Sequence, residues 1–435
     1  MSATHKQSYQ PTRLVVLPSN WSVRRLSTLT KSYAGGTPDR SKPEYFEGDI
    51  PWVKSGEVNK RKITNTEERI SDVALSESSA KIAEAGSVLV AMYGATAGKV
   101  ARLKIDAAIN QAVLSIRAAV NELDNDYLFW AMERNAEKLL AMCQGAAQPN
   151  LSKGLIDGLE IAIPPISEQQ KIAAILTAVD DKLDVIARQI EATETLQRGL
   201  MQTLFSRGIG TQDADGRWVS HAEFKDSELG RIPASWEVRP IGSLFDVVER
   251  SVEMDDAQLY RRVTVKRRFG GIELRDELPG AAIKVKNQFS VEAGDFLISE
   301  RQIVHGACGV LPSALTGALV SNEYLVLKAK PGTDVRYFNY MVQLLRFKKY
   351  FLLCSQGVDI EKFLFKPKDW LKKMVPVPLS EEQMQIADVL AMADQKLQVL
   401  KKKQSEYQAL QRGLMQKLLS GEWLVKLEDT EPLAA

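Results

Sequence analysis

The sequence predicts an α+β protein in which two globular domains alternate with two long helices, and the helices pair as an antiparallel coiled coil. The heptamer LQRGLMQ occurs at Leu196–Gln202 and again at Leu410–Gln416. A seven-residue match is improbable by chance, so a duplicated unit is expected. Apolar residues around each copy recur at steps of three and four, as in coiled-coil helices. Shorter matching segments in the rest of the chain indicate that the domains are duplicated too.

The composition allows several domains and excludes some classes of protein. The 435 residues carry a net charge of only +2, so any nucleic-acid contact must come from local basic clusters. Cys143, Cys308 and Cys354 form no C-x-x-C pair, which argues against a disulfide framework or a thiolate zinc site and favours a reducing cytoplasm. The three histidines are far apart in the chain, so a histidine metal cluster is not expected. No apolar run is long enough to cross a membrane, and the N-terminus has no hydrophobic signal core.

The first domain is expected over residues 1–166 and the second over residues 209–379. Both mix short β-branched runs, such as GSVLVAM and YLVLKA, with one or two helices, which is typical of compact α+β domains. The segment NWSVRRL, with Trp21, parallels SWEVRPI, with Trp236, and we interpret both tryptophans as core residues. AEAGSVLVAMYG likewise parallels VEAGDFLISERQ. Between these segments the two domains diverge, so two similar scaffolds carry different surfaces.

The two long helices are predicted over residues 167–208 and 380–421, followed by a tail at 422–435. Their sequences align without gaps at a constant offset (377 − 163 = 214 and 410 − 196 = 214). Ser167 and Ser380, each followed by Glu, suit helix starts. At about 1.5 Å per residue, each helix spans roughly 60 Å. The predicted seam consists of Ile172, Leu176, Val179, Leu183, Ile186, Ile190, Leu200, Leu204, Ile386, Leu390, Leu397, Leu400, Leu410, Leu414 and Leu418.

Mutual burial of the two stripes is the simplest interpretation, because neither helix has enough other apolar surface to be stable alone. Antiparallel pairing is preferred since it places the two domains at opposite ends of the pair. Two amphipathic helices in unrelated bundles remain the alternative.

The second domain contains the strongest basic cluster, YRRVTVKRRFGG. Phosphate contacts need Lys and Arg, and base contacts use Arg, Lys, Asn, Gln and Ser or Thr on exposed loops. The DNA-contact candidates of this domain are Arg261, Lys266, Arg267, Arg268, Arg301, Gln302 and His305. The plainer interpretation of the cluster is a solvated strand end. A third basic segment, RFKKY, is expected on a helix as a solvated or phosphate-facing surface.

The first domain offers candidates in three loops, within PWVKSGEVN, MYGATAGKV and AQPNLSK. They are Lys54, Ser55, Tyr93, Thr96, Lys99, Gln148, Asn150, Ser152 and Lys153. Asn or Gln can pair with adenine through two hydrogen bonds. The residue types do not tell which side chain meets which base.

Three catalytic classes are disfavoured. GATAGKV has three residues rather than four between its glycines and Val100 after the lysine, so it is not a phosphate loop. IPPIS lacks the amide or carboxylate with which an adenine methyltransferase would hold a flipped base. A nuclease would need clustered carboxylates beside a lysine, and no such spacing stands out.

The combination of motifs resembles the specificity subunit of type I restriction–modification systems, over essentially the whole chain. It rests on IPPISEQQKIAAILTAVDDKL, on the repeated LQRGLMQ, and on NWSVRRL and SWEVRPI opening the two domains. PWVKSGEVN, MYGATAGKV, NQAVLSI and QPNLSKGLI in the first domain are similar to target-recognition-domain motifs. GDFLISERQIVHGACGV and SNEYLVL are similar to those of a different recognition-domain type.

The resemblance implies a non-catalytic subunit that binds double-stranded DNA at a split site, one half per target recognition domain, with the helices setting the spacer. Two unlike domains imply an asymmetric site. Two adenine-N6 methyltransferase subunits would dock on the chain and bind S-adenosylmethionine, and up to two restriction subunits would add ATP- and Mg-dependent cleavage. The chain itself would bind no cofactor or metal. A coiled-coil scaffold with two modules that do not bind DNA is the alternative.

Overall fold

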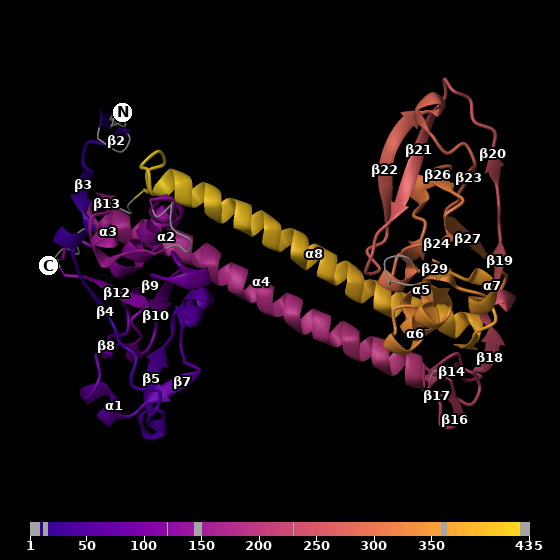
Figure 1. Ribbon diagram of the computed structural model, residues 1–435, viewed down its shortest axis with the longest axis horizontal. Coiled ribbons are helices and arrows are strands. Elements are labelled where there is room, and N and C mark those ends of the chain that lie inside the picture. The colour runs from indigo at the N-terminus through magenta and orange to yellow at the C-terminus, as the bar shows by residue number, and fades with distance from the viewer. Residues whose placement is uncertain are drawn as a thin grey trace. The chain divides into compact units, whose positions relative to one another are not determined.

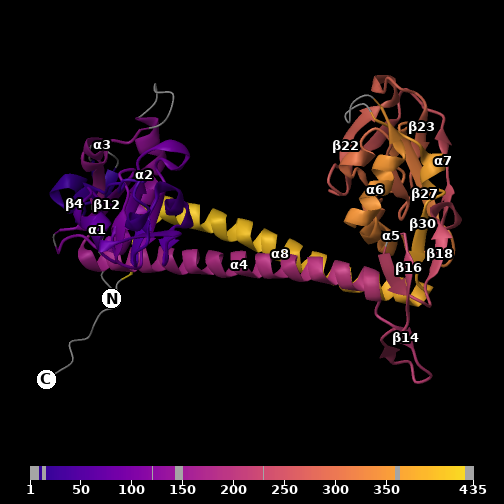
Figure 2. The ribbon, with the colours of Figure 1, turned by 60° about the horizontal axis from the view of Figure 1, so that its bottom comes forward.

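The computed structural model describes residues 9–11, 16–119, 121–142, 150–228, 230–357 and 363–426. The chain folds into two compact units, one of residues 1–187 with 402–435 and the other of residues 188–401. Both unit boundaries fall inside the long helices α4 (Ile166–Arg207) and α8 (Ser380–Leu418). Figure 1 draws both as uninterrupted ribbons, and Figure 2 shows the same for α4. Each unit therefore holds one globular domain and half of each helix. The predicted domain limits lie instead at the helix ends, because sequence periodicity marks where a helix stops and not what it packs against.

The domain of unit 1 contains two mixed sheets. One has the strand order β4-β12-β9-β10-β6 and the other β7-β5-β11-β8. The strands are β4 (Thr30–Ala34), β5 (Ile50–Val53), β6 (Lys62–Ile63), β7 (Glu68–Ile70), β8 (Lys81–Ala83), β9 (Val88–Ala91), β10 (Val100–Leu103), β11 (Ala107–Ile109) and β12 (Val113–Ala118). Helices α1 (Asp72–Ser76), α2 (Asn125–Ala141) and α3 (Lys153–Asp157) complete the domain. Every residue of β9 is buried, because side chains from both faces of this central strand enter a core.

The domain of unit 2 repeats this topology. Its sheets have the orders β19-β27-β24-β25 and β20-β23-β26-β21-β22, so β4-β12-β9-β10 and β7-β5-β11-β8 recur as β19-β27-β24-β25 and β22-β21-β26-β23. The strands are β19 (Phe245–Val247), β20 (Ser251–Val252), β21 (Leu259–Val265), β22 (Ile272–Pro279), β23 (Gln288–Ser290), β24 (Phe296–Ser299), β25 (Cys308–Val310), β26 (Leu319–Ser321) and β27 (Tyr324–Ala329). Helices α5 (Val335–Met341), α6 (Leu345–Leu353) and α7 (Pro367–Trp370) belong to the same domain.

Short two-stranded ladders complete the two units. They are β1 (Tyr9–Pro11) with β2 (Val16–Pro18), β3 (Ser22–Arg25) with β13 (Glu160–Ile163), β14 (Thr211–Gln212) with β15 (Trp218–Val219), β16 (Phe224–Ser227) with β17 (Gly230–Pro233), β18 (Glu237–Pro240) with β30 (Met374–Val377), and β28 (Ser355–Gln356) with β29 (Leu364–Phe365). β13 and β30 lead directly into α4 and α8.

Two buried tryptophans hold these junctions. Trp21 Nε1 donates to Glu168 Oε2 at 3.0 Å, and Trp236 Nε1 donates to Glu382 Oε2 at 2.9 Å. Both carboxylates lie in the first turn of a long helix, where the helix dipole favours a negative charge. The tryptophans are therefore core residues that connect the start of each domain to its helix.

The two long helices pack antiparallel within each unit. In unit 1, Ile172 near the start of α4 packs in one cluster with Leu418 at the end of α8. In unit 2, Leu204 at the end of α4 packs in one cluster with Ile386 near the start of α8. The start of one helix thus meets the end of the other in both units (Figure 1).

Most residues of the predicted seam are buried or half-buried. Fully buried are Ile172, Leu176, Ile186, Leu204, Ile386, Leu390, Leu397, Leu400 and Leu418; half-buried are Val179, Leu183, Ile190, Leu200 and Leu414. Leu410 is the exception, because its side chain is 48% exposed, and the prediction that places it in the seam is wrong. A helix of 3.6 residues per turn drifts away from a strict seven-residue repeat, and here the neighbouring Gln411 faces the seam instead.

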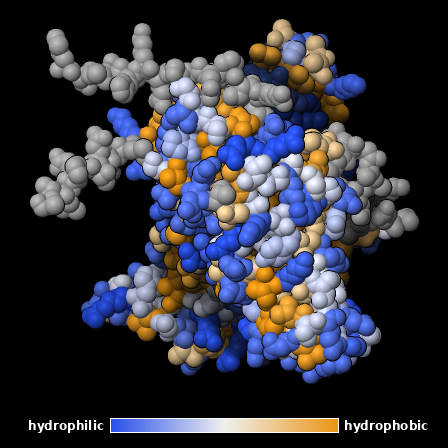
Figure 3. Space-filling model, turned by 90° about the vertical axis from the view of Figure 1, so that its left-hand side faces the viewer, coloured by the Kyte–Doolittle hydropathy of each residue, from blue (hydrophilic) through white to orange (hydrophobic). Residues whose placement is uncertain are grey.

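No helix among the described residues is both long and apolar enough to cross a membrane. On the face drawn in Figure 3, hydrophilic and intermediate residues cover most of the surface, and hydrophobic residues form separate patches.

Candidate nucleic-acid interface

In the first domain, the structure brings two of the predicted loops together. Tyr93 pairs with Asn150 in an isolated antiparallel bridge, and Leu151 N donates to Met92 O at 2.9 Å. The loop between β9 and β10 can turn so tightly because Gly94 and Gly98 have φ values of +75° and +78°. Thr96 and Lys99 on this loop are therefore held beside the segment that leads into α3.

The side chains of this surface differ in how much they are already engaged. Lys99 is exposed and makes no ion pair within the described part of the chain. Ser152 caps α3 by accepting a hydrogen bond from Leu155 N, and Lys153 forms an ion pair with Asp157. Lys99 is thus the most available cation of the surface, while Ser152 and Lys153 also have local structural roles.

Lys54 and Ser55 begin the 3-10 helix η3 (Ser55–Lys60), which packs against η4 (Gly94–Thr96) and so joins the same surface. Lys54 Nζ lies 2.7 Å from Glu68 Oε1 and 3.5 Å from Glu67 Oε2. The hydrogen bond to Glu68 raises the pKa of Lys54 above its ordinary value. Its charge is balanced by these carboxylates, so it suits phosphate less well than Lys99 does. Gln148 lies outside the described residues.

In the second domain, the turn after β21 is bonded to the loop after β24. Arg268 N donates to His305 O at 2.7 Å, and Phe269 N donates to Gly306 O at 2.8 Å. Arg268 and Phe269 have φ values of +59° and +56°, a conformation that costs energy in residues with a Cβ atom. The two backbone bonds hold the turn in this conformation.

These loops and α6 form a cleft of about 320 Å³, which we call the arginine cleft. Its lining residues are Arg267, Arg268, Phe269, Ile303, Val304, His305, Gly306, Lys348 and Phe351. Sequence analysis placed Lys348, from RFKKY, on a solvated or phosphate-facing helix surface, but only the fold places it here. Its Nζ lies 5.0 Å from the centre of the Phe269 ring.

Two other candidates of the second domain have engaged side chains. Arg261 donates to the carbonyl oxygens of Ala314 and Thr316, at 3.1 and 2.8 Å. Lys266 Nζ lies 2.5 Å from Glu273 Oε2. Arg261 thus bonds to the segment between β25 and β26, and Lys266 pairs across the β21–β22 hairpin. Arg267 and Arg268 of the predicted basic cluster line the arginine cleft.

Arg301 and Gln302 precede the 3-10 helix η7 (Ile303–His305). Arg301 Nε lies 2.6 Å from Glu323 Oε1, and this pair links the loop after β24 to the loop between β26 and β27. The Gln302 Oε1 atom is buried and accepts no hydrogen bond within the described part of the chain. A buried acceptor without a hydrogen bond destabilises the fold, and this one lies next to the donor groups of the arginine cleft.

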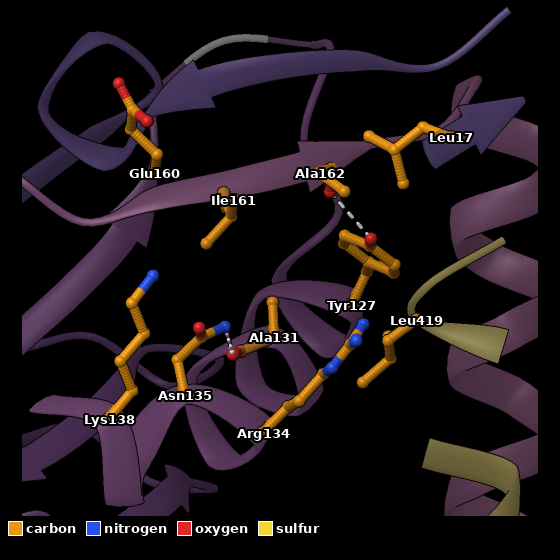
Figure 4. A pocket seen from close by; sticks show the side chains of 10 residues that line it. All are labelled: Leu17, Tyr127, Ala131, Arg134, Asn135, Lys138, Glu160, Ile161, Ala162 and Leu419. Atoms are coloured by element: carbon orange, nitrogen blue, oxygen red, sulfur yellow. Dashed lines mark hydrogen bonds between the residues drawn. The ribbon is translucent and has the colours of Figure 1, made fainter. Parts of the chain in front are cut away.

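A separate cavity of about 180 Å³ lies in unit 1 between α2, β13, Leu17 and Leu419 (Figure 4). Tyr127 donates to Ala162 O at 2.7 Å across it, and burial lowers the pKa of Arg134 below the ordinary value for a guanidinium group. None of the predicted contact residues lines this cavity. No group of three or more His, Cys, Asp or Glu residues that could hold a metal occurs among the residues that the structure describes.

The candidate surfaces of the two domains lie at equivalent positions of the repeated fold. The loop that follows β9 in the first domain and the loop that follows β24 in the second occupy the same place in the same strand order. Each carries polar or cationic residues, yet their sequences differ. The shared scaffold therefore presents two chemically distinct loop surfaces.

Comparison with known proteins connects this architecture to one family. Residues 18–195 match the family model described as type I restriction modification DNA specificity domain. The MjaVIII specificity subunit of a type I restriction enzyme from Methanocaldococcus jannaschii is 24% identical over 427 residues, which cover 94% of each chain. The EcoR124I/EcoR124II specificity subunit of Escherichia coli is 28% identical over 181 residues, covering 40% of this chain and 43% of that one.

A solved structure has the same fold over nearly the full length. The crystal structure of the S subunit of a type I restriction–modification system from M. genitalium aligns with a TM-score of 0.60 at 17% identity. The alignment covers 94% of this chain and 97% of that chain. This chain is therefore similar in sequence to specificity subunits of type I restriction–modification systems, and it has the fold of one of them.

Proposed function

We propose that this chain is the sequence-specific DNA-binding subunit of a type I restriction–modification complex and that it reads an asymmetric split site. The observation that carries the proposal is the repeated topology, in which the loops after β9 and β24 take equivalent places but carry different residues. Identical readers would bind a palindrome, whereas unlike readers bind unlike half-sites.

The contact residues proposed in the first domain are those around η4, with Tyr93, Thr96, Lys99 and Asn150 as the readers and Lys99 as the cation for phosphate. In the second domain, Arg267, Arg268 and His305 line the arginine cleft together with Lys348. Arg is the residue that most often reads guanine through two hydrogen bonds, and Asn pairs in the same way with adenine. The different residue types support different base preferences in the two half-sites.

The spacing of the two half-sites is proposed to depend on α4 and α8. Both helices are continuous through the boundary between the units. The length of the unread spacer would then follow from helix length and not from the recognition loops.

The chain itself is a non-catalytic subunit, and we assign the chemistry to partners. Two methyltransferase subunits would supply S-adenosylmethionine and methylate adenine N6 after flipping the base. Restriction subunits, up to two, would supply ATP- and Mg-dependent cleavage. The complex would act on double-stranded DNA in the cytoplasm.

A selection of random duplexes by the full chain with its methyltransferase partner tests the proposal. We expect enrichment of a split motif with a constant spacer. Arg267→Ala with Arg268→Ala should weaken binding and lower the dependence of log K on log salt by about one unit per lost phosphate contact. Lys372→Ala, on the same unit beyond α7, is the matched control. If no split motif is enriched, the chain is a protein scaffold and the proposal is wrong.

A further inference from the structure

A second cleft in unit 2 has the chemistry of a nucleic-acid contact. Arg262, from the basic cluster YRRVTVKRRFGG, lines it, whereas its other cations, Arg275 and Lys284, were not predicted as contacts. It has a volume of about 430 Å³ and crosses strands β22, β21, β26 and β23 of the five-stranded sheet. We call it the sheet cleft. Its lining residues are Arg262, Val263, Arg275, Ala282, Lys284, Val285, Gln288, Leu319, Val320, Ser321, Asn322, Glu323 and Tyr324.

Two cations of the sheet cleft, Arg275 and Lys284, remain available to bind a ligand. Arg262 holds both oxygens of Asp276, with Nε–Oδ1 and Nη2–Oδ2 distances of 2.8 Å each. The hydrogen bond to Arg262 holds the pKa of Asp276 below its ordinary value. Both oxygens of Asp276 are thereby engaged, and the contact from Arg275 Nε to its Oδ2 is long, at 3.6 Å, with 60% of the Arg275 side chain exposed. Arg275 therefore keeps most of its hydrogen-bonding capacity.

Lys284 is exposed and has no ion pair or hydrogen bond from its side chain to any residue that the structure describes. Asn322 is exposed too, and its amide is likewise unengaged among the described residues. The only carboxylate that lines the cleft is Glu323, which Arg301 already neutralises at 2.6 Å. The cleft thus offers the exposed Lys284, the amide of Asn322 and Arg275, whose contact with Asp276 is long, while Asp276 and Glu323 are paired with Arg262 and Arg301.

The sheet cleft and the arginine cleft are neighbours across a single ridge. Glu300 N donates to Glu323 O at 3.0 Å, and the Arg301–Glu323 ion pair joins the same two loops. On one side of this ridge the loop after β24 continues to His305 in the arginine cleft, and on the other side Glu323 and Asn322 line the sheet cleft. The loops that line the two clefts are therefore joined to each other, which allows one polyanion to contact both.

We propose that the sheet cleft binds the sugar-phosphate backbone of the same DNA duplex, outside the bases read in the arginine cleft. Arg275 and Lys284 contact phosphates, and Asn322 donates to a phosphate or sugar oxygen. The proposal rests on the proposed function and extends it. In it, the sheet cleft positions the DNA without reading its bases, and it lies outside the recognition loops. Backbone contacts of this kind set the register and orientation of a protein on the duplex.

The test compares two duplexes bound by the full chain with its methyltransferase partner. One ends at the second half-site and the other continues about ten base pairs beyond it. Arg275→Ala with Lys284→Ala should weaken binding of the long duplex by about 10-fold or more and reduce its salt slope by one to two units, with base preference unchanged. The short duplex should be much less affected. Arg275→Lys with Lys284→Arg should restore the salt slope, which excludes a general folding defect.

Each alternative outcome has one meaning. If the wild type enriches a split motif but the double variant binds both duplexes as the wild type does, the sheet-cleft proposal is wrong and the proposed function stands. If DNA binding is unchanged and assembly with the methyltransferase weakens instead, the cleft serves a protein partner and the DNA proposal is overturned. If the wild type enriches no motif, the proposed function itself fails and this inference fails with it.

Discussion

Gln411 of α8 donates a hydrogen bond from Nε2 to Asp180 Oδ1 of α4 at 3.0 Å in unit 1. The repeat places the same pair in unit 2, where Gln197 of α4 donates to Asp394 of α8. Both positions shift by the offset of the duplicated helices (411 − 197 = 214 and 394 − 180 = 214). The glutamine of LQRGLMQ therefore sets the register of the helix pair twice, and it explains why a polar residue of the heptamer is repeated.

Asp180 and Asp394 are expected to contribute differently to stability. Asp180 lies 3.2 Å from Arg61 Nη2 and 3.5 Å from Arg102 Nη1, and the buried Arg102 guanidinium stacks 3.8 Å above the Phe129 ring. Asp180→Ala removes one of two carboxylates beside Arg102, the other being Asp126 at 3.1 Å from Arg102 Nε, and should lower the free energy of unfolding by about 3 kcal/mol. Asp394→Ala loses hydrogen bonds from Tyr340 and Gln197, which should cost about 1–3 kcal/mol.

Urea unfolding of the full chain, followed by circular dichroism, measures both changes. Asp394→Asn is the matched control, because it keeps the size of the side chain. Equal losses for the two alanine variants would contradict the different roles assigned to the two aspartates.

The tryptophan junctions should respond unequally to loss of the indole N–H. Glu168 accepts hydrogen bonds from Trp21 and Asn20, whereas Glu382 also accepts from Ile209 N, Gly210 N and His221 besides Trp236. Trp21→Phe should cost about 1.5–3 kcal/mol, because the Glu168 carboxylate keeps one partner. Trp236→Phe should cost less. Thermal unfolding of both variants measures the two losses of stability. A larger loss for Trp236→Phe than for Trp21→Phe would contradict the prediction.

Gly306 tests whether the shape of the arginine cleft matters independently of its charge. Gly306 has a φ of +75°, and a Cβ atom there would lie 2.8 Å from Cε2 of Phe269. Gly306→Ala should displace the Phe269 ring and weaken DNA binding several-fold while leaving the salt slope unchanged, because no cation is lost. Gly317→Ala has a similar φ but open space around the new methyl group, so it controls for backbone strain. If Gly306→Ala and Gly317→Ala weaken DNA binding equally, the shape of the arginine cleft does not affect binding.

Because of the buried Cys308 thiol, the free energy of unfolding should decrease as the pH rises into the alkaline range. Complete burial raises the pKa of the Cys308 thiol well above its ordinary value. The thiol ionises near pH 8.5 only in the unfolded chain, so its stabilising contribution is complete below that pH and declines above it. The stability advantage of wild type over Cys308→Ala should shrink by about 1.4 kcal/mol at pH 9.5. Urea titrations from pH 7.5 to 9.5, with Cys143 replaced by Ser in both proteins, measure it; a constant difference would refute the prediction.

Lengthening the helix pair tests its proposed control of the spacer. Seven residues inserted after Ala187 and after Lys401 keep the heptad phase and add about 10.5 Å to each helix. The preferred spacer should grow by about three base pairs with both half-sites unchanged. The same insertion in the turn between β14 and β15 is the control and should change neither. Altered half-site bases at constant spacing would contradict this role of the helices.

Much of the fold could be predicted because its signals are local. The exact repeat predicted duplication, and the three-four spacing predicted both helices close to the bounds that the structure has. Leu410 shows the limit of this reasoning, because ideal periodicity places it in the seam while the drift of a real helix turns Gln411 inward instead.

The residue types alone predicted basic loops with the chemistry of DNA contact, and their motifs predicted the similarity to type I specificity subunits. Only the tertiary structure decided which of them share a surface. Lys54 and Lys266 form ion pairs with carboxylates on neighbouring strands. By contrast, Lys348, Arg275 and Lys284 line clefts. The physical reason is that periodicity and repeats follow from neighbouring residues along the chain, whereas the neutralisation or exposure of a charge depends on which strands and loops pack beside it.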